Sequence, residues 1–545
     1  MSADETGIDR RQFLAVAGTG AATATLSGCL NLDEPSGDGD DGGDGGDGSG
    51  NELVYIDLDS LTTTDPARAS GASDYSAIIN IYDPLFYVEA ETFRTIENLA
   101  TDWEASDDGT QYEVTIRDDA THHNGDPVTA EDVAFSMNRL MSINESPASV
   151  FAGIFGENAA EAVDETTVSF DLQIAYAPVL TALTQLFVVN SNEVRDAGED
   201  YLNDNTAGSG PYELDGLTEG SRLSLTAFED YWGGWEDDQF DSARHEVISE
   251  ESTARIMMEQ GDADLTSKFL SADTYDELEG YDNVRVAVQP ELFLWHITMN
   301  TQKPPFDDVK VREAVAHSFD YQAVVENVLR DGQPAAGPVP VGMPGHNDDL
   351  EPYGQDLDAA QAALEESSYT VEEINSYEME HMYTNAVAWA EPITLILEDG
   401  LGELGISIQS NNTPWAQMLE RASSQDTTPH FTQVGNTARI ASPDWHTYGQ
   451  YHPSVQGEIN ASAWYENDEV TTLLEDARTT FDEEERFSKY REAQSLVYED
   501  YPSIFIANPA YKAGINENLG GWKYRGVLSY EHRWYEMFRD GDGRA

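Results

Sequence analysis

The clearest pattern of hydrophobic and polar positions lies between residues 111 and 140. Apolar and polar residues alternate from Tyr112 to Arg117, which predicts a strand with one buried face. Residues 122–128 (HHNGDPV) follow as a predicted tight turn, because Asn-Gly tolerates positive φ and proline fixes the exit. Thr129 then has the side chain of a helix N-cap, and apolar residues at 133, 137, 140 and 141 share one helical face. The stretch therefore predicts one α/β unit of strand, turn and helix.

The alternating pattern of strands and the three-to-four-residue spacing of helices recur along the chain. Strands are predicted from residue 53 and over 212–214 and 223–227, and residues 78–86 are predicted to be a helix that runs into a loop. Further helices are predicted over 311–319, 324–329 and 356–364, and as a pair between residues 470 and 497. Asp107–Gly109 has the composition of a hairpin turn, and we expect Trp103 before it to lie in the core. With 545 residues the chain is too long for one core, so two or three globular units are expected.

Several of these segments carry motifs of a known family. Ile116-Arg117, NGDP at 124–127, TAEDV at 129–133 and Phe135-Ser136 together resemble the signature of the family-5 extracellular solute-binding proteins, the peptide- and nickel-binding subunits of ABC importers. Further resemblances are TDP at 64–66, residues 99–109, AGSGPY at 207–212, YWGG at 231–234 and KPPFDDV at 303–309. The similarity extends from about residue 52 to about residue 510. Helix capping, turn formation and core packing account for every residue of the signature, so we interpret these residues as structural and not as ligand-binding.

The resemblance implies an α/β fold of the bilobed, periplasmic-binding-protein-like class (type II), with an additional domain and two crossovers between the lobes. Lobe I would comprise residues 52–83, 207–297 and 504–545, the additional domain 84–206, and the second ligand-binding lobe (lobe II) 298–503. The lobes would close on a small solute by hinge motion and present it to the permease of an ABC importer. Partner ATPase subunits would supply the energy, because the chain has no G-x-x-x-x-G-K-[ST] loop.

Charge is the unusual feature of the composition. Lys and Arg number 28 against 103 Asp and Glu, a formal net charge of -75, while 40% of the residues are hydrophobic, as in a globular protein. Such a surface repels itself in dilute buffer, but at molar salt the Debye length falls to about 3 Å. We therefore predict a protein from an extreme halophile. No basic face exists to neutralise phosphates, so neither nucleic acid nor bare anionic lipid is expected as a partner.

The N-terminal residues predict export and anchoring. Arg10 and Arg11 in DRRQFL resemble a twin-arginine export signal, and Cys29 after Leu-Ser-Gly resembles the lipidated cysteine of a lipobox. These residues define a signal over 1–29, and the Gly/Asp-rich tract 30–51 is predicted to be a flexible tether. Cys29 is the only cysteine, so no disulfide can form within the chain. We expect a monomer held by its lipid at the extracellular face of the cell membrane.

The ligand question centres on residues 433–448. In peptide-binding relatives a G-W-x-x-D-x-x-D-P run lines the cleft, and its first Asp binds the α-ammonium of the ligand. Here Gly435 keeps the glycine, Asn436 stands at the Trp position, Arg439 replaces the ammonium-binding Asp, and Ser442 replaces the second Asp. A guanidinium cannot pair with an ammonium, but it can bind a carboxylate or phosphate with two hydrogen bonds. Arg439 therefore favours an anionic or polar ligand if it faces the cleft; the alternative is a surface arginine paired with a neighbouring acid.

Other candidate ligand residues rest on weaker patterns. Trp415 and Trp445 could stack on a ligand or pack in the core. Ser70 and Gly71 resemble a segment that offers backbone groups to ligands in relatives, or form an ordinary turn. The remaining candidates are Thr437 beside Asn436, and His446 and His452, which leave a metal-chelate ligand open.

No pattern predicts catalysis. The sequence has no G-x-S-x-G elbow, no H-E-x-x-H and no cysteine nucleophile, and adjacent carboxylates are uninformative among 103 acids. We therefore predict a binding protein that is not an enzyme and needs no cofactor or resident metal. Two alternatives to an importer subunit stay open: a ligand-binding module for a chemosensory transducer, and a metal-chelate binder.

Overall fold

The computed structural model describes residues 51–540 except 199 and 219. Arg10, Arg11 and Cys29 lie outside these residues, as does the predicted tether up to residue 50. Among the described residues, no helix combines the length and apolar character needed to cross a lipid bilayer.

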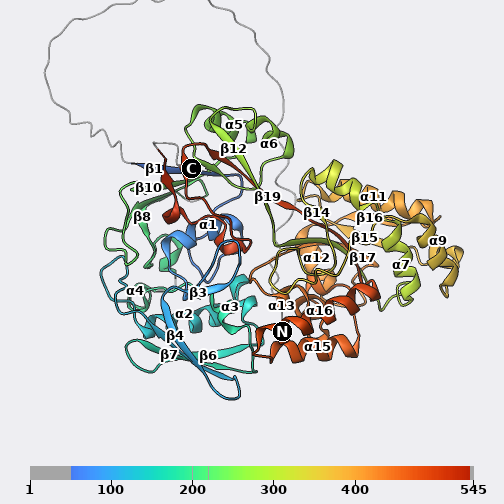
Figure 1. Ribbon diagram of the computed structural model, residues 1–545, viewed down its shortest axis with the longest axis horizontal. Helices are drawn as coiled ribbons and strands as arrows, with labels where there is room; N and C mark the ends of the chain where they lie inside the picture. Colours follow the sequence, from blue (N-terminus) through green and yellow to red (C-terminus); the bar gives the residue numbers. More distant parts are fainter. Residues whose placement is uncertain (1–50, 199, 219, 541–545) are drawn as a thin grey trace, which may run out of the picture. The chain divides into compact units, whose positions relative to one another are not determined.

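Lobe I is built on a seven-stranded sheet in the order β12-β19-β11-β1-β10-β9-β8 (Figure 1). Alternate residues of β1 face two different cores: Leu53 and Tyr55 pack with α1, whereas Val54 and Ile56 pack with α5 and α6. This burial on both faces explains why residues 53–56 in the middle of β1 are all apolar. The elements of the lobe are β1 (Glu52–Asp57), α1 (Ala72–Ile81), β8 (Tyr212–Thr218), β9 (Arg222–Ala227), β10 (Ser242–Val247), α5 (Glu251–Gln260), β11 (Leu265–Thr266), α6 (Ala272–Leu278), β12 (Val284–Pro290) and β19 (Ala510–Asn516).

The additional domain is a four-stranded antiparallel sheet, β4-β5-β7-β6, with helix α2 (Ala130–Ile143) packed against it. The predicted strand is β5 (Gln111–Ile116), with alternate residues buried, and Gly109 in the predicted hairpin turn has φ +67°. Its other strands are β4 (Ala100–Ala105), β6 (Phe155–Ala162) and β7 (Thr167–Leu172). The prediction that Trp103 lies in the core is wrong: its side chain is 40% exposed, because β4 is an edge strand.

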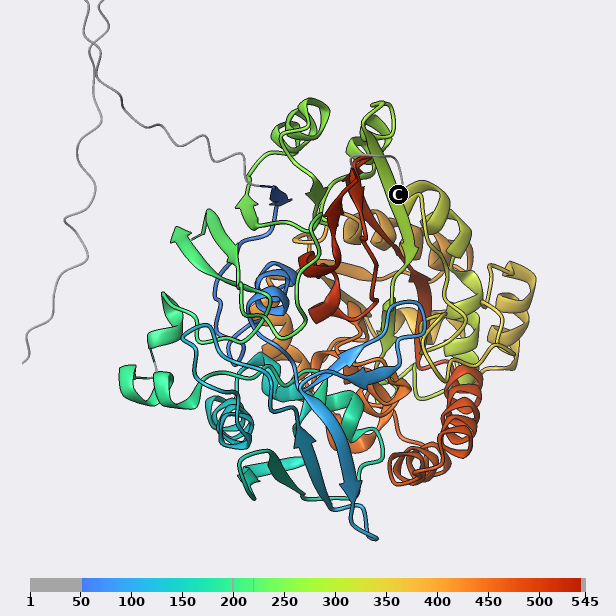
Figure 2. The same cartoon turned by 60° about the vertical axis from the view of Figure 1, so that its left-hand side comes forward.

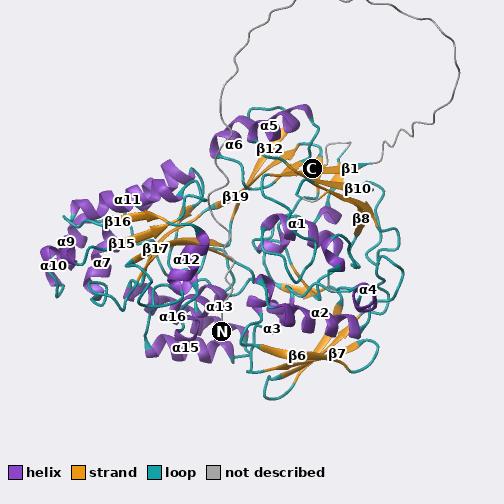
Figure 3. Ribbon diagram, turned by 180° about the vertical axis from the view of Figure 1, so that it is seen from behind, coloured by secondary structure: helices purple, strands orange, loops and turns teal. Residues whose placement is uncertain are grey.

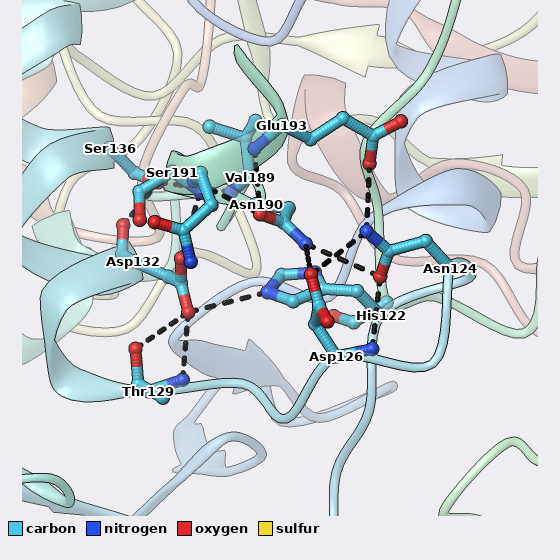
Figure 4. A network of polar contacts seen from close by, with 12 residues as sticks. His122, Asn124, Asp126, Thr129, Asp132, Ser136, Val189, Asn190, Ser191 and Glu193 are labelled. Atoms are coloured by element: carbon cyan, nitrogen blue, oxygen red, sulfur yellow. Dashed lines mark hydrogen bonds and ion pairs between the residues drawn. The ribbon is translucent and has the colours of Figure 1, made fainter. Parts of the chain in front are cut away.

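A polar network joins the predicted turn to α2 (Figure 4). Asp132 accepts hydrogen bonds from the backbone and hydroxyl of Thr129 (2.9 and 2.7 Å) and from the backbone of Ser191 (2.8 Å). His122 Nε2 lies 3.4 Å from the same carboxylate. Burial would raise the pKa of Asp132, but His122 and the hydrogen bonds lower it below its ordinary value. The prediction that this stretch is scaffold is consistent with these contacts, because each partner belongs to the domain itself.

Lobe II contains a six-stranded sheet in the order β14-β18-β13-β17-β15-β16, with α7, α9 and α11 packed around it (Figure 3). The predicted helices are present, and Asp320 and Asp356 cap two of them with their carboxylates. The elements are β13 (Phe293–Met299), α7 (Val309–Ser318), α8 (Tyr321–Ala323), the π-helix η3 (Val324–Leu329), β14 (Gln333–Pro334), α9 (Leu357–Glu366), α10 (Val371–Ser376), β15 (Glu380–Tyr383), α11 (Ala390–Glu403), β16 (Gln409–Asn412), α12 (Trp415–Ala422), β17 (Phe431–Thr437), α13 (Pro443–His446), α14 (Tyr448–Tyr451), α15 (Asp468–Arg478), α16 (Glu483–Asp500) and β18 (Ser503–Asn508).

Two adjacent connections join the lobes. Chain passes from β12 to β13 through Glu291 and Leu292, and returns from β18 to β19 through Pro509. Because β12 pairs with β19 and β13 pairs with β18, the connections lie side by side (Figure 2). The predicted boundaries at 297/298 and 503/504 are therefore misplaced: β13 and β18 belong wholly to the lobe II sheet. Their buried, apolar sequences do not reveal which sheet they join.

Shorter elements complete the chain: β2 (Phe86–Val88), β3 (Thr95–Glu97), η1 (Ser146–Val150), α3 (Val179–Leu183), α4 (Ser191–Ala197), η2 (Tyr201–Asn203), η4 (Pro453–Val455), η5 (Ile459–Ala461), β20 (Leu519–Gly520), η6 (Leu528–Tyr530), η7 (Trp534–Glu536) and β21 (Phe538–Arg539).

Candidate functional site

Strand β17 positions the predicted ligand segment. Gly435 lies opposite Trp295 of β13, and a Cβ at Gly435 would stand 2.3 Å from Cζ of Phe293 and 2.6 Å from Cε3 of Trp295. The two aromatic rings thus occupy the space that any side chain at this position would need. The glycine in the motif is explained by this packing, so it shapes the strand and offers only its backbone to a ligand.

Beyond β17 the chain leaves the lobe II sheet and meets the other two domains. The backbone of Ala438 donates to the carbonyl of Leu292 in the first connection (2.9 Å). Ile440 belongs to the core of the additional domain, and Ala441 to the core of lobe I. Residues 438–441, the interdomain segment, therefore contact all three domains of the described chain.

Arg439 lies in the middle of the interdomain segment and is partly buried. Its guanidinium donates to the hydroxyl of Tyr75 on α1 (3.2 Å) and to the hydroxyl and carbonyl of Ser146 on η1 (2.7 and 3.4 Å). No carboxylate lies within 4 Å of it among the described residues, so the alternative of a surface ion pair is wrong. Tyr75 and Ser146 were missed by sequence reasoning, because nothing in the sequence marks them as partners of Arg439.

A second interdomain contact converges on Asp444, the second residue of α13. Its buried carboxylate accepts hydrogen bonds from Tyr490 in lobe II and from Tyr176 in the additional domain, both at 2.9 Å. Arg478 Nε lies 3.4 Å from the same carboxylate, and its guanidinium lies over the Tyr176 ring. Asp444 therefore fastens the additional domain to lobe II within one charged cluster, which the sequence motif did not indicate.

Three more of the predicted residues are brought together next to Arg439. The indole nitrogen of Trp445 donates to the side chain of Asn436 (2.9 Å) and to the carbonyl of Thr437 (3.0 Å). Its ring packs partly buried against the core of the additional domain. Trp445 thus braces the end of β17, and Asn436 is 3% exposed, so both act first as supports of the interdomain segment.

The remaining predicted residues lie apart or serve the scaffold. Ser70 and Gly71 stand at the N-terminus of α1, where both backbone N–H groups point at Asp74 (3.2 and 3.4 Å), one turn before Tyr75. Trp415 begins α12 and is 48% exposed, and no described contact connects it with Arg439. Ser70 and Gly71 therefore stay close to the Arg439 cluster, whereas Trp415 does not join it.

The histidines near this segment are buried and separate. Nε2 of His446 donates a 3.1 Å hydrogen bond to the backbone carbonyl of Asn436, and burial lowers the pKa of His446 to about 4. His452 instead stacks on Tyr448 and contacts Ser454. Within the described part of the chain, no three His, Cys, Asp or Glu side chains are grouped so as to hold a metal ion.

A charged cluster lies beside the first connection between the lobes. Lys268 Nζ stands 2.6 Å from Glu291 and 2.7 Å from Glu531, so one ammonium faces two carboxylates. Burial raises the pKa of Glu531 to about 7, against the attraction of Lys268 and with the repulsion of Glu291. A carboxyl group next to the connection thus titrates near neutral pH.

Comparison with known proteins gives this arrangement a context. Residues 94–458 match the sequence profile of the bacterial extracellular solute-binding proteins, family 5 Middle. The chain is 28% identical to the probable D,D-dipeptide-binding periplasmic protein DdpA of Escherichia coli K12, over 86% of this chain and 90% of that one. It is 26% identical to the dipeptide-binding protein of the same strain, over 86% and 91% of the two chains. Among solved structures, the periplasmic binding protein DppA of Helicobacter pylori in complex with the peptide STSA superimposes with a TM-score of 0.74, at 23% identity, over 90% of this chain and 98% of that chain. The fold is thus the periplasmic-binding-protein-like one that the sequence predicted.

Proposed function

Because the chain belongs to the family-5 extracellular solute-binding proteins, which bind solutes for transport and are not enzymes, we propose that it captures a small solute bearing a carboxylate. Closure of the lobes about the paired connections would enclose that solute, and the closed protein would deliver it to an ABC permease. Arg439 would bind the carboxylate of the solute.

The observation that carries this proposal is the set of partners around Arg439. Among residues 51–540 as described, its guanidinium has only hydroxyl and carbonyl partners, although the chain has 103 acidic residues. A partly buried cation without a counter-ion has an unfavourable desolvation energy, which an incoming carboxylate offsets with two charge-assisted hydrogen bonds. The position also lies where lobe I, the additional domain and lobe II meet, so a ligand bound there touches the parts that closure brings together.

The relatives support the ligand class in broad terms. The names of relatives refer to dipeptides, D,D-dipeptides and glutathione as ligands. Free peptides of these kinds end in a carboxylate. In the resemblance described above, an aspartate at the position of Arg439 would bind the ammonium end of a peptide. The reversed charge here supports a ligand bound through its acidic end.

Export and anchoring complete the proposal. Arg10 and Arg11 would direct the folded chain through the twin-arginine route, and a lipid on Cys29 would hold it at the extracellular face of the membrane. The net charge of -75 supports a working environment of molar salt. Cys29→Ala should move the protein from the membrane fraction to the medium, while retention in the membrane would contradict the anchor.

The ligand itself can be tested directly. The protein is purified without denaturation in molar NaCl, the co-purifying compound is identified by mass spectrometry, and its affinity is measured by calorimetry. Arg439→Ala should weaken binding by roughly 10- to 100-fold, the loss of a hydrogen bond between charged groups. Arg421→Ala is the matched control, since Arg421 pairs with Glu380 at 2.6 Å within lobe II. A co-purifying compound without an acidic group, or equal affinity in Arg439→Ala and wild type, would overturn the proposal.

A further inference from the structure

A cavity of about 580 Å³ lies away from the Arg439 cluster. Three segments form it: the hairpin of β2 and β3, the loop 231–233, and residues 523–536 near the C-terminus. None of its lining residues contacts the interdomain segment through a described hydrogen bond or ion pair. Its volume lies within the range of about 300–1,000 Å³ that is typical of small-molecule sites.

Basic residues are concentrated in this cavity. Three of the 28 Lys and Arg residues of the chain line it: Lys523, Arg525 and Arg533. Arg525 donates twice to Glu536 (2.7 and 3.0 Å), and Lys523 lies 3.5 Å from the same carboxylate. One carboxylate thus serves two of the cations, and Arg533 is left as the third.

Arg533 is the cation without a counter-ion. It is 8% exposed and makes no ion pair within 4 Å among the described residues. One NH₂ group donates to the hydroxyl of Tyr231 (2.9 Å), whereas its Nε–H is buried with no acceptor. The charges of two carboxylates, Asp83 and Glu536, act on Arg533 without an ion pair. Asp83 already accepts hydrogen bonds from Tyr231, Trp232 and Ser209. Arg533 therefore lines the cavity with a positive charge that no ion pair neutralises among the described residues.

The walls and the rim of the cavity differ in character. The rings of Tyr87 and Tyr535 lie 4.3 and 5.4 Å from the Arg533 guanidinium and hold it in place. At the rim, Glu89, Glu91 and Glu97 are exposed to solvent. A buried cation inside and carboxylates at the mouth complement a molecule with a negative end and a positive end.

We propose that this cavity is a second ligand site, separate from the Arg439 site, which binds a small zwitterion of the amino-acid or dipeptide class. The carboxylate of the zwitterion binds the guanidinium of Arg533, and its ammonium lies toward the glutamates of the rim. The site does not depend on the proposed function, because it lies outside the segment that contacts all three domains.

The test uses the full chain carrying Arg439→Ala, so that binding at the first site is weakened and its contribution is separated from the second site by the two variants described below. Calorimetry in molar NaCl measures three probes: the dipeptide Gly-Tyr, its C-terminal amide and its N-acetyl form. We expect one Gly-Tyr per chain, at least tenfold weaker binding of the amide, and a smaller loss for the N-acetyl form. No binding of Gly-Tyr, or equal binding of the amide and the free acid, would overturn the proposal.

Two further changes locate the site. Arg533→Gln should abolish Gly-Tyr binding, and circular dichroism reports whether that variant is folded. Ala90→Trp places a bulky ring in the β2–β3 loop at the cavity and leaves the buried cation untouched, so it should block binding in a folded protein. If Gly-Tyr still binds to Ala90→Trp with unchanged affinity, the site lies elsewhere and the proposal is wrong.

Discussion

The carboxylate of Asp444 offers a matched pair of substitutions. Tyr176→Phe and Tyr490→Phe each remove one hydroxyl, each hydroxyl lies 2.9 Å from Asp444, and both rings are at most 1% exposed. The two differ in one respect: the Tyr490 bond lies within lobe II, whereas the Tyr176 bond crosses to the additional domain. They therefore separate the cost of losing a buried hydrogen bond from its effect on the contact between domains.

A hydrogen bond to a charged group contributes about 1.5–3 kcal/mol. Both variants should lose about that much free energy of unfolding, measured by urea denaturation at constant molar NaCl. Only Tyr176→Phe should also favour separation of the additional domain from lobe II, by roughly 10- to 150-fold in the equilibrium constant. The ring of Tyr176 stays over Arg478, and the backbone bond from Ala177 to Arg478 (2.7 Å) remains, so the contact weakens without disappearing.

Small-angle X-ray scattering measures that separation directly. The radius of gyration of Tyr176→Phe should exceed that of the wild type, and the radius of Tyr490→Phe should equal it. If both variants expand alike, or if neither does, the Tyr176 bond does not hold the domains together and the reasoning fails.

Three other predictions concern single positions. Gly435→Ala should lower the free energy of unfolding in urea by about 1–3 kcal/mol, because the added Cβ would overlap the Phe293 ring. The control is Gly216→Ala, also in a strand, which should change that free energy by no more than about 0.5 kcal/mol, because no atom lies within 4 Å of an added Cβ. Equal urea midpoints for the two variants would contradict the packing argument. Because the pKa of Asp132 is lowered in the folded state, its contribution to stability is present above about pH 4 and is lost as the pH falls below that, and Asp132→Asn should remove this acid-dependent part of the unfolding free energy. The pKa of Glu531 is raised to about 7 in the folded protein, so its effect on stability runs in the opposite direction with pH. The free energy of unfolding should fall by up to about 3 kcal/mol as the pH rises from about 4.5 to 7. An unchanged pH profile in Glu531→Gln would show that another group is responsible.

The local structure of the chain could be predicted where short-range chemistry decides it. The alternation of β5, the turn at Gly109 and the capping of α2 by Thr129 all depend on residues within a few positions of each other. The exposed position of Trp103 could not be predicted, because the sequence does not show that β4 is the edge strand of its sheet. For the same reason the sequence placed the crossovers several residues from their positions at Leu292 and Pro509.

The candidate site likewise has a part that the sequence could predict and a part that only the folded structure shows. The sequence singled out Arg439 by its departure from a motif, and the structure finds it at the meeting point of three domains. Its partners Tyr75 and Ser146 are 364 and 293 residues away in the chain, and only the folded structure brings them together. Hydroxyl groups are too common in the sequence to predict such a pairing.

The acidic composition makes the lack of an ion pair at Arg439 and Arg533 unusual among the described residues. In a chain with 103 acids against 28 bases, a surface cation readily finds a carboxylate, so pairing alone says little about function. Arg439 and Arg533 instead have tyrosine hydroxyls as partners and keep their charge at the edge of the protein interior. Salt screens exposed acids within about 3 Å at molar concentration but screens a buried guanidinium much less. If the protein works in molar salt and takes an acidic solute, as we propose, the few buried cations would attract that solute while the screened surface carboxylates would no longer repel it.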